Sequence, residues 1–178
     1  MESREQGNSN RRAAAADRLW EFATTLYAST AVAAACLHAQ DELGMDVNLI
    51  LYAAWRASDG QALSAPRLAD IAAACRDWQS AVVQPLRARR REWKQTRPDG
   101  FEYAAIKALE LQAEKAQLEL LASLDGNVLP VAETIGIAGH DDTAERDALL
   151  ANNLRALCRH YDVDESALDP LRQALARA

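Results

Sequence analysis

Glycine and proline are scarce in this chain, with 7 and 5 among 178 residues. Because both residues interrupt regular structure, a chain that has few of them contains few turns. Alanine is abundant instead, and it is the best helix former because it loses no side-chain entropy on folding. The composition therefore favours helices joined by short connections.

Cysteines and long apolar runs are also lacking. Cys36, Cys75 and Cys158 are odd in number and far apart, which excludes a disulfide framework and is typical of a reducing compartment. No apolar run approaches the roughly 20 residues that a membrane span needs. The polar stretch 1–12 has no apolar core of a secretory signal. We therefore expect a cytoplasmic protein without a membrane partner.

Charge is one-sided, with a formal net charge of −6 at pH 7. A uniformly acidic surface repels nucleic acid, so any nucleic-acid partner would require a local basic patch. A length of 178 residues corresponds to one domain. Such a chain buries a sufficient core without disulfides or metals.

The segments that are present have identifiable helix starts and stops. Leu19, Phe22 and Leu26 recur at spacings of three and four, which predicts an apolar helix stripe. Ser29-Thr30 and Asp46 stand where N-caps are expected, since their side-chain oxygens accept from free N–H groups of the next turn. Ser64-Ala65-Pro66 marks another helix start, because proline is tolerated in the first turn. The pattern predicts helices over residues 17–27, 31–43, 47–58, 65–78, 85–95, 101–124, 143–160 and 165–176.

These segments predict an all-α fold, an antiparallel bundle of about seven helices, in which 65–78 and 85–95 count as one helix with a kink near Pro85. Pro85 removes a backbone N–H and clashes with the preceding turn, so we expect a kink or break near residues 82–84. The expected organisation has four parts: a disordered lead-in over 1–16, a main helical domain over 17–125, an irregular connection over 126–142, and a C-terminal helical hairpin over 143–178 packing on the same domain.

Two Cys-x-His pairs, Cys36 with His38 and Cys158 with His160, suggest metal binding at first sight. Both pairs lie on predicted helices, where residues two apart point about 200° away from each other and cannot share one metal. Phosphate-binding loops, dinucleotide fingerprints and the nucleophile elbow of hydrolases are missing. The sequence therefore predicts no metal, no cofactor and no catalytic residue.

A polar cluster follows the second predicted helix, with Gln40 and Asp41 before Gly44 and Asp46 and Asn48 after it. In one interpretation Asp46 caps a helix and the other side chains are solvated at a helix end. In the other, the four polar residues converge with an arginine from the basic segment 87–97. Together they would form a pocket for a polar or anionic ligand, or for acid–base chemistry.

The segment 87–97 concentrates positive charge, with six basic residues and one acidic residue. At 100° per residue, five of these side chains fall within about 120° of each other on a helix. They are Arg87, Arg90, Arg91, Lys94 and Arg97.

Three interpretations of this basic helix remain open. It is solvated or paired internally with the long helix that bears Glu102, Glu110, Glu114 and Glu119; or it docks an acidic protein partner; or it binds nucleic acid or phosphorylated ligands. We favour a non-enzymatic interaction or regulatory protein that docks an acidic partner. A small-ligand binder or enzyme is the alternative, and nucleic-acid binding is the third.

Several spaced motifs carry a family resemblance. The pattern LWxFAxxLY from Leu19 is followed by ACLxxQD, GxDVN and VxPLRxxR, the last ending at Arg90. This order resembles a family of short bacterial helical proteins described as a conserved domain of unknown function, and the resemblance covers roughly residues 19–121. It implies a cytoplasmic bacterial helical protein and supplies no reaction, cofactor or catalytic residue.

Overall fold

A computed structural model describes residues 2–124 and 142–177, and within these ranges every regular element is a helix. The all-α prediction is confirmed. The elements in chain order are α1 Glu2–Tyr27, α2 Thr30–Glu42, α3 Val47–Ser58, α4 Ala65–Trp78, a π-helical segment η1 Gln79–Val83, α5 Gln84–Thr96, α6 Phe101–Leu124, α7 Asp142–Tyr161, a 3₁₀ turn η3 Glu165–Leu168, and α8 Asp169–Ala176.

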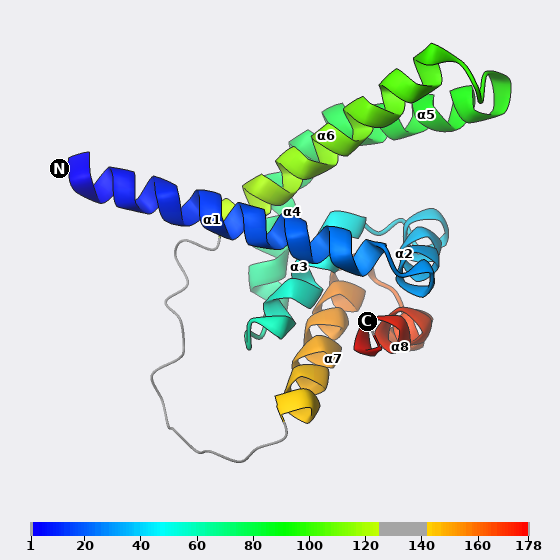
Figure 1. Ribbon diagram of the computed structural model, residues 1–178. Coiled ribbons are helices and arrows are strands. Elements are labelled where there is room, and N and C mark those ends of the chain that lie inside the picture. The colour runs from blue at the N-terminus through cyan, green and yellow to red at the C-terminus, as the bar shows by residue number, and fades with distance from the viewer. Residues whose placement is uncertain (1, 125–141, 178) are drawn as a thin grey trace.

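The centre of the bundle is α3, which is surrounded by α1, α2, α6 and α7 (Figure 1). Every residue from Val47 to Ala57 is buried, as expected of a helix that is enclosed by others rather than amphipathic. Asp46 caps it, because its carboxylate accepts from the Asn48 N–H at 2.9 Å. Gly44 precedes this cap with φ +66, a backbone conformation that favours glycine. The predicted N-cap at Asp46 is confirmed.

The helix that was expected to kink or break near residues 82–84 continues through α4, η1 and α5 without leaving helical geometry. The disturbance is the π-helical segment η1, where the Gln84 N–H donates to the Gln79 carbonyl. Pro85 follows directly and has no N–H to donate. A π turn shifts the hydrogen-bond register by one residue, which accommodates the proline without ending the helix.

The antiparallel pair α5 and α6 extends from the body as an arm (Figure 1). α6 packs against α1, α3 and α4 as well as α5. The charged face of α5 meets α6 through Arg87 and Arg90, which pair with Glu110, and it meets α2 through Arg91, which pairs with Asp41.

The first helix begins much earlier than predicted. Residues 1–16 were expected to be a disordered lead-in, but α1 is helical from Glu2 and projects beyond the body (Figure 1). Leu19, Ala23 and Leu26 are buried and anchor its second half. Once a packed helix exists, its extension through the alanines of residues 13–16 needs no new nucleation, and this explains the difference.

The C-terminal helices pack onto the main body. α7 lies along α3, where Leu150, Leu154 and Leu157 join the same core cluster, and α8 packs against α2. An irregular connection was expected over residues 126–142. Residues 126–141 lie outside the described residues, and Asp142 begins α7.

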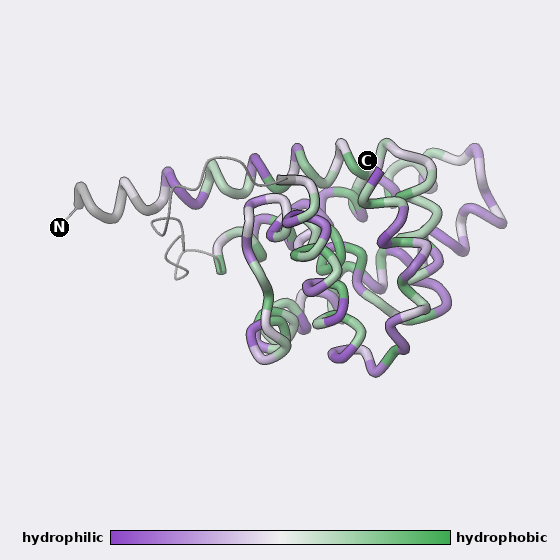
Figure 2. Tube along the Cα trace, turned by 90° about the horizontal axis from the view of Figure 1, so that it is seen from below, coloured by the Kyte–Doolittle hydropathy of each residue, from purple (hydrophilic) through white to green (hydrophobic). Residues whose placement is uncertain are grey.

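No single helix within the described ranges is both long enough and apolar enough to cross a membrane. Ser9–Tyr27 and Thr30–Glu42 meet those criteria only when taken together, and they are bent by 100° relative to each other. Figure 2 shows hydrophilic residues interspersed along the helices.

Candidate functional site

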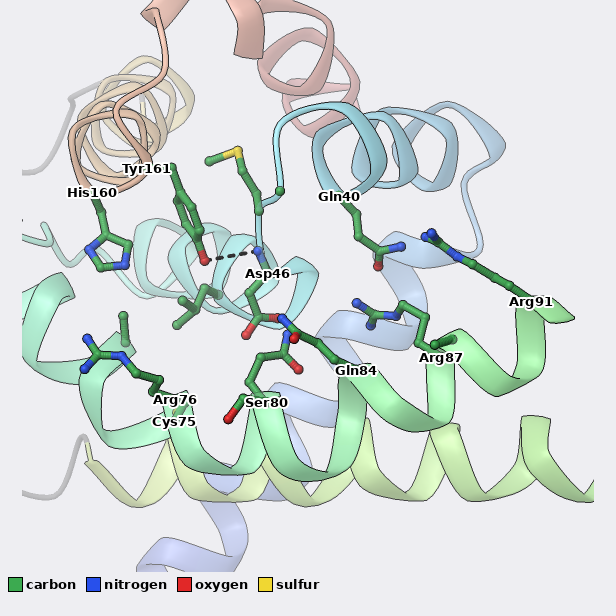
Figure 3. Close-up of a pocket in the computed structure, with 16 residues that line it drawn as sticks. Gln40, Asp46, Cys75, Arg76, Ser80, Gln84, Arg87, Arg91, His160 and Tyr161 are labelled. Atoms are coloured by element: carbon green, nitrogen blue, oxygen red, sulfur yellow. Dashed lines mark hydrogen bonds between the residues drawn. The ribbon is translucent and has the colours of Figure 1, made fainter.

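A cavity of about 420 Å³ opens where the end of α2, the start of α3, the α4–η1–α5 helix and the end of α7 meet (Figure 3). We call it the polar pocket, because most of its lining side chains carry charges or hydrogen-bonding groups. These side chains are Gln40, Asp46, Cys75, Arg76, Gln79, Ser80, Gln84, Arg87, Arg91, His160 and Tyr161.

Asp46 is the carboxylate of this lining, and it is 6% exposed. Gln117 donates to one carboxylate oxygen, and the Asn48 N–H donates to the other. Its own backbone N–H donates to the Tyr161 hydroxyl at 3.1 Å (Figure 3). Burial raises the pKa of Asp46, and the hydrogen bonds from Gln117 and Asn48 oppose that rise. A buried carboxyl beside a cavity with a raised pKa is a frequent property of functional sites.

Arg87 is the most firmly held cation of the polar pocket. Its guanidinium donates to Glu110 at 3.3 Å and to Glu114 at 2.6 Å, and Arg90 donates to the second oxygen of Glu110. Both glutamates come from α6, one turn apart. Since Arg87 is only 9% exposed, its orientation is fixed before any ligand arrives.

Two further arginines surround the cavity and are less constrained. Arg91 pairs with Asp41, but both side chains are nearly half exposed, and such surface pairs contribute little energy. Arg76 makes no ion pair or hydrogen bond through its side chain with any residue in the described ranges. Figure 3 shows Arg76 and His160 on one side of Asp46, with Arg87 and Arg91 on the other.

Gln79 and Cys75 also line the polar pocket and bear on what it could bind or react with. The side-chain amide oxygen of Gln79 is buried and has no hydrogen-bond partner among the described residues, so it remains available to a donor. Burial and the nearby Asp46 charge raise the pKa of the Cys75 thiol to about 11. A protonated thiol is a poor nucleophile at neutral pH, so the pocket offers charge and hydrogen bonds rather than an activated sulfur.

The structure brings together part of the polar cluster that the sequence singled out. Gln40 and Asp46 line the polar pocket, and Asp41 lies next to it, accepting from Gln40 and Arg91. Asn48 points elsewhere, because its side chain donates to Gln117 at 3.0 Å and to the Glu114 carbonyl.

Sequence reasoning missed Arg76, Gln84, His160 and Tyr161 in this lining. Tyr161 is separated from Asp46 by 115 residues, and no local pattern connects positions that far apart. Arg76 has a weak sequence signal, because it lies in the last turn of the helix predicted over residues 65–78.

The basic helix is paired internally to a large extent, which is one of the alternatives that the sequence left open. Arg87 and Arg90 bind Glu110 and Glu114, and Arg97 pairs with Glu102 at 3.2 Å. Of the four glutamates expected to face this helix, three do so. Glu119 forms no ion pair within the described residues.

This pairing leaves few of the five cations of the basic face without a partner. Among them only Lys94 has no charged partner in the described part of the chain. A nucleic-acid contact through this face would therefore have to displace glutamates from Arg87 and Arg90, which reduces the number of phosphates that it could neutralise.

No three histidine, cysteine, aspartate or glutamate side chains come together as a metal site within residues 2–124 and 142–177. Cys36 is buried whereas His38 is exposed, so this pair points in different directions, as the helical spacing predicted.

Residues 18–121 match the family described as protein of unknown function DUF2390. The chain belongs to the DUF2390 family. The matched range contains every pocket element from α2 to α5 and the glutamates of α6, and it ends before His160 and Tyr161 of α7. The family recognised from the sequence motifs is thereby confirmed over nearly the same residues. No curated protein and no solved structure matches the chain.

Proposed function

We propose that this DUF2390 protein binds a small anionic molecule, one that carries a carboxylate or phosphate group, in the polar pocket. The observation that carries the proposal is that three arginines, Arg76, Arg87 and Arg91, line one cavity whose lining has a single carboxyl group. Guanidinium groups form planar, charge-assisted hydrogen bonds with such anions.

The electrostatics of the lining support an anion. Asp46 is the carboxyl group of the lining, and burial raises its pKa; this shift favours the neutral carboxyl group and so lessens the repulsion that an anion would meet. Arg76 has no partner in the described part of the chain. The exposed ion pair of Arg91 with Asp41 can be broken at a small cost in free energy.

The hydrogen-bonding groups support a ligand that also carries a donor. Gln79 presents a buried acceptor that no described residue satisfies, and an unsatisfied buried acceptor costs free energy until it is paired. Arg87 is held in place by Glu110 and Glu114, so it binds without losing side-chain freedom. The function supported best is therefore binding of an anion that bears a hydroxyl or amino group.

Isothermal titration calorimetry with inorganic phosphate, succinate and glutamate tests this proposal. We expect at least one of these anions to bind with one-to-one stoichiometry, and Arg76→Gln or Arg91→Gln to weaken binding about tenfold, the loss of one charge-assisted contact. Arg89→Gln is the matched control, because Arg89 lies on α5 and pairs with Glu92 outside the pocket.

Failure of all three anions to bind would refute the proposal as stated. Equal weakening by Arg91→Gln and Arg89→Gln would also contradict it, because the attraction would then come from overall charge and not from the pocket.

Docking of an acidic protein partner is the second candidate function, and the tip of the α5–α6 arm favours it. Phe101 at the start of α6 is 84% exposed, and Lys94 nearby on α5 has no ion-pair partner in the described ranges. Cross-linking in cell extracts with the wild type and with Phe101→Ser/Lys94→Glu should yield different partners. Identical partners for both, with unchanged circular dichroism, would exclude this tip as the docking surface.

A further inference from the structure

A second cavity, of about 570 Å³, lies between α1, α2 and α6, and Gln40 and Arg87 border both it and the polar pocket. We call it the apolar cleft. Most of the residues that line the apolar cleft but not the polar pocket have apolar side chains. The ones that matter below are Trp20, Ala23, Leu37, Leu51, Leu111 and Leu118.

The mouth of the apolar cleft exposes apolar side chains to solvent. Leu37 on α2 is 43% exposed and Leu111 on α6 is 53% exposed, although they line the same cavity. Apolar groups gathered around an open cavity are unfavourable in water unless something covers them, and such surfaces commonly mark binding sites. Ala108 also lines the cavity and is exposed on α6, and its small side chain occupies little of the space there.

The inner end of the cleft is formed by core residues. Ala23, Leu51 and Leu118 are at most 5% exposed, so an occupant must reach past the mouth to contact them. An alkyl chain is far more slender than a helix, which is about 10 Å across with its side chains, so it needs a smaller opening to reach these buried residues. The volume is also within the roughly 300–1,000 Å³ of small-molecule sites.

The positive charge of the lining that has no ion-pair partner among the described residues lies at the end opposite Leu118. Lys107 lines the cleft and has no ion pair within the described residues, while the two glutamates of the lining are bound to Arg87 and Arg90. Lys107 and Leu118 lie eleven residues apart on α6, about 16 Å at 1.5 Å per residue. The cleft thus has a cationic end and an apolar end.

We propose that the apolar cleft binds a free, single-chain anionic amphiphile, a medium-length fatty carboxylate, with its head at Lys107 and its tail toward Leu118. The cationic end complements the carboxylate, and the buried inner residues accept the chain. This site adjoins the polar pocket, with which it shares Gln40 and Arg87, but the proposal does not rest on the anion binding proposed there.

Titration calorimetry with octanoate, decanoate and dodecanoate, each below its micelle concentration, tests the proposal on the full chain. We expect saturable one-to-one binding, with the Kd falling roughly tenfold for each two methylenes added. Dodecyltrimethylammonium should bind more weakly than dodecanoate. Lys107→Glu should reverse that order, because it inverts the charge at the mouth.

A matched pair of variants locates the site. Ala108→Phe places a ring in the cleft and should abolish dodecanoate binding, whereas Gln112→Phe adds a ring to an exposed position of α6 outside the lining and should leave it unchanged. Arg91→Gln, which alters the polar pocket alone, should also have no effect.

Three results would overturn the proposal. These are the absence of dodecanoate binding to a folded protein, equal affinity for the carboxylate and ammonium amphiphiles, and binding that Ala108→Phe leaves intact. A protein partner that Ala108→Phe displaces while dodecanoate does not bind would assign the cleft to that partner instead.

Discussion

Asp46 connects the local and the long-range structure of this protein. As the N-cap of α3 it accepts from the Asn48 N–H, a role that follows from its position before an apolar helix. As a buried carboxyl it accepts from Gln117 of α6, and its backbone N–H donates to Tyr161 of α7. The cap was predictable from sequence, whereas the contacts with α6 and α7 were not, because they depend on how three distant helices meet.

The raised pKa of Asp46 predicts a specific pH dependence of stability. The folded protein holds the Asp46 proton more tightly than the unfolded chain does. Its contribution to stability is therefore fully present below the ordinary aspartate pKa of about 4 and is lost as the pH rises through the raised folded pKa. We expect the free energy of unfolding of wild type minus that of Asp46→Asn to decrease between about pH 4 and pH 7.

Urea unfolding across this pH range measures the difference, and the exposed Asp70→Asn serves as the control for losing one carboxylate. A difference that stays constant or increases with pH would show that the hydrogen bonds from Gln117 and Asn48 outweigh burial.

Glu110 provides a second prediction at this scale. It is 5% exposed and accepts from both Arg87 and Arg90. Removing one partner of a buried ion pair leaves the other charges poorly compensated, at a typical cost of about 3 kcal/mol. Glu110→Gln should therefore lower the free energy of unfolding by about this amount. Glu119→Gln, exposed on the same helix, should change it by less than about 0.5 kcal/mol, and equal effects of the two would contradict the assigned pairing.

At the scale of elements, the side chain of Asn153 adds a buried polar attachment of α7 to the body. Asn153 is fully buried, accepts from the Leu63 N–H at 2.6 Å, and donates to the Ala53 and Gln61 carbonyls at 3.0 Å each. It thus joins α7 to α3 and to the α3–α4 connection. No helical pattern in the sequence indicates this, because the three backbone groups it satisfies lie about 90 to 100 residues away.

Asn153→Ala should lower the free energy of unfolding by about 3 kcal/mol, because it leaves buried backbone groups without partners. Its neighbour Asn152 makes longer contacts, at 3.3 and 3.4 Å, so Asn152→Ala should cost under about 1 kcal/mol. Urea denaturation of both variants measures the contrast. If the two costs were similar, α7 would be held mainly by its apolar contacts.

Pro85 illustrates the limit of local rules at the same scale. The expectation of a kink or break followed from the missing N–H and the ring. The chain instead forms a π-helical segment before the proline, and its Val83 is fully buried. Packing of that segment against α6 compensates for a less favourable local geometry, which residue preferences alone do not include.

At the scale of the whole molecule, the thiols report on cooperative unfolding. Cys36, Cys75 and Cys158 are each at most 2% exposed, and burial raises the pKa of Cys36 to about 12 and that of Cys75 to about 11. Burial also raises the pKa of Cys158. All three sulfurs are therefore protonated and inaccessible in the folded state at pH 8.

We expect a chromogenic thiol reagent at pH 8 to modify none of the three cysteines rapidly in the native protein, and all three in denaturant. The rate in native buffer should follow the rate of global unfolding. A single fast thiol would contradict this expectation. If that thiol were Cys75, it would show that the wall of the polar pocket opens without unfolding of the rest.

The sequence by itself determined the fold class, most helix boundaries and the position of the charged segment, because these depend on interactions within a few residues. Caps such as Asp46 and the three- and four-residue apolar spacing act locally. Tertiary structure alone decided which groups the arginines face. Glu110 and Glu114 meet Arg87 and Arg90 because α6 runs antiparallel to α5 at one rotation and offset. Arg76, His160 and Tyr161 line the same cavity as Asp46 only because α7 packs against both α3 and α4. A helix period fixes which side chains share a face, whereas the partner of that face depends on the packing of the whole core.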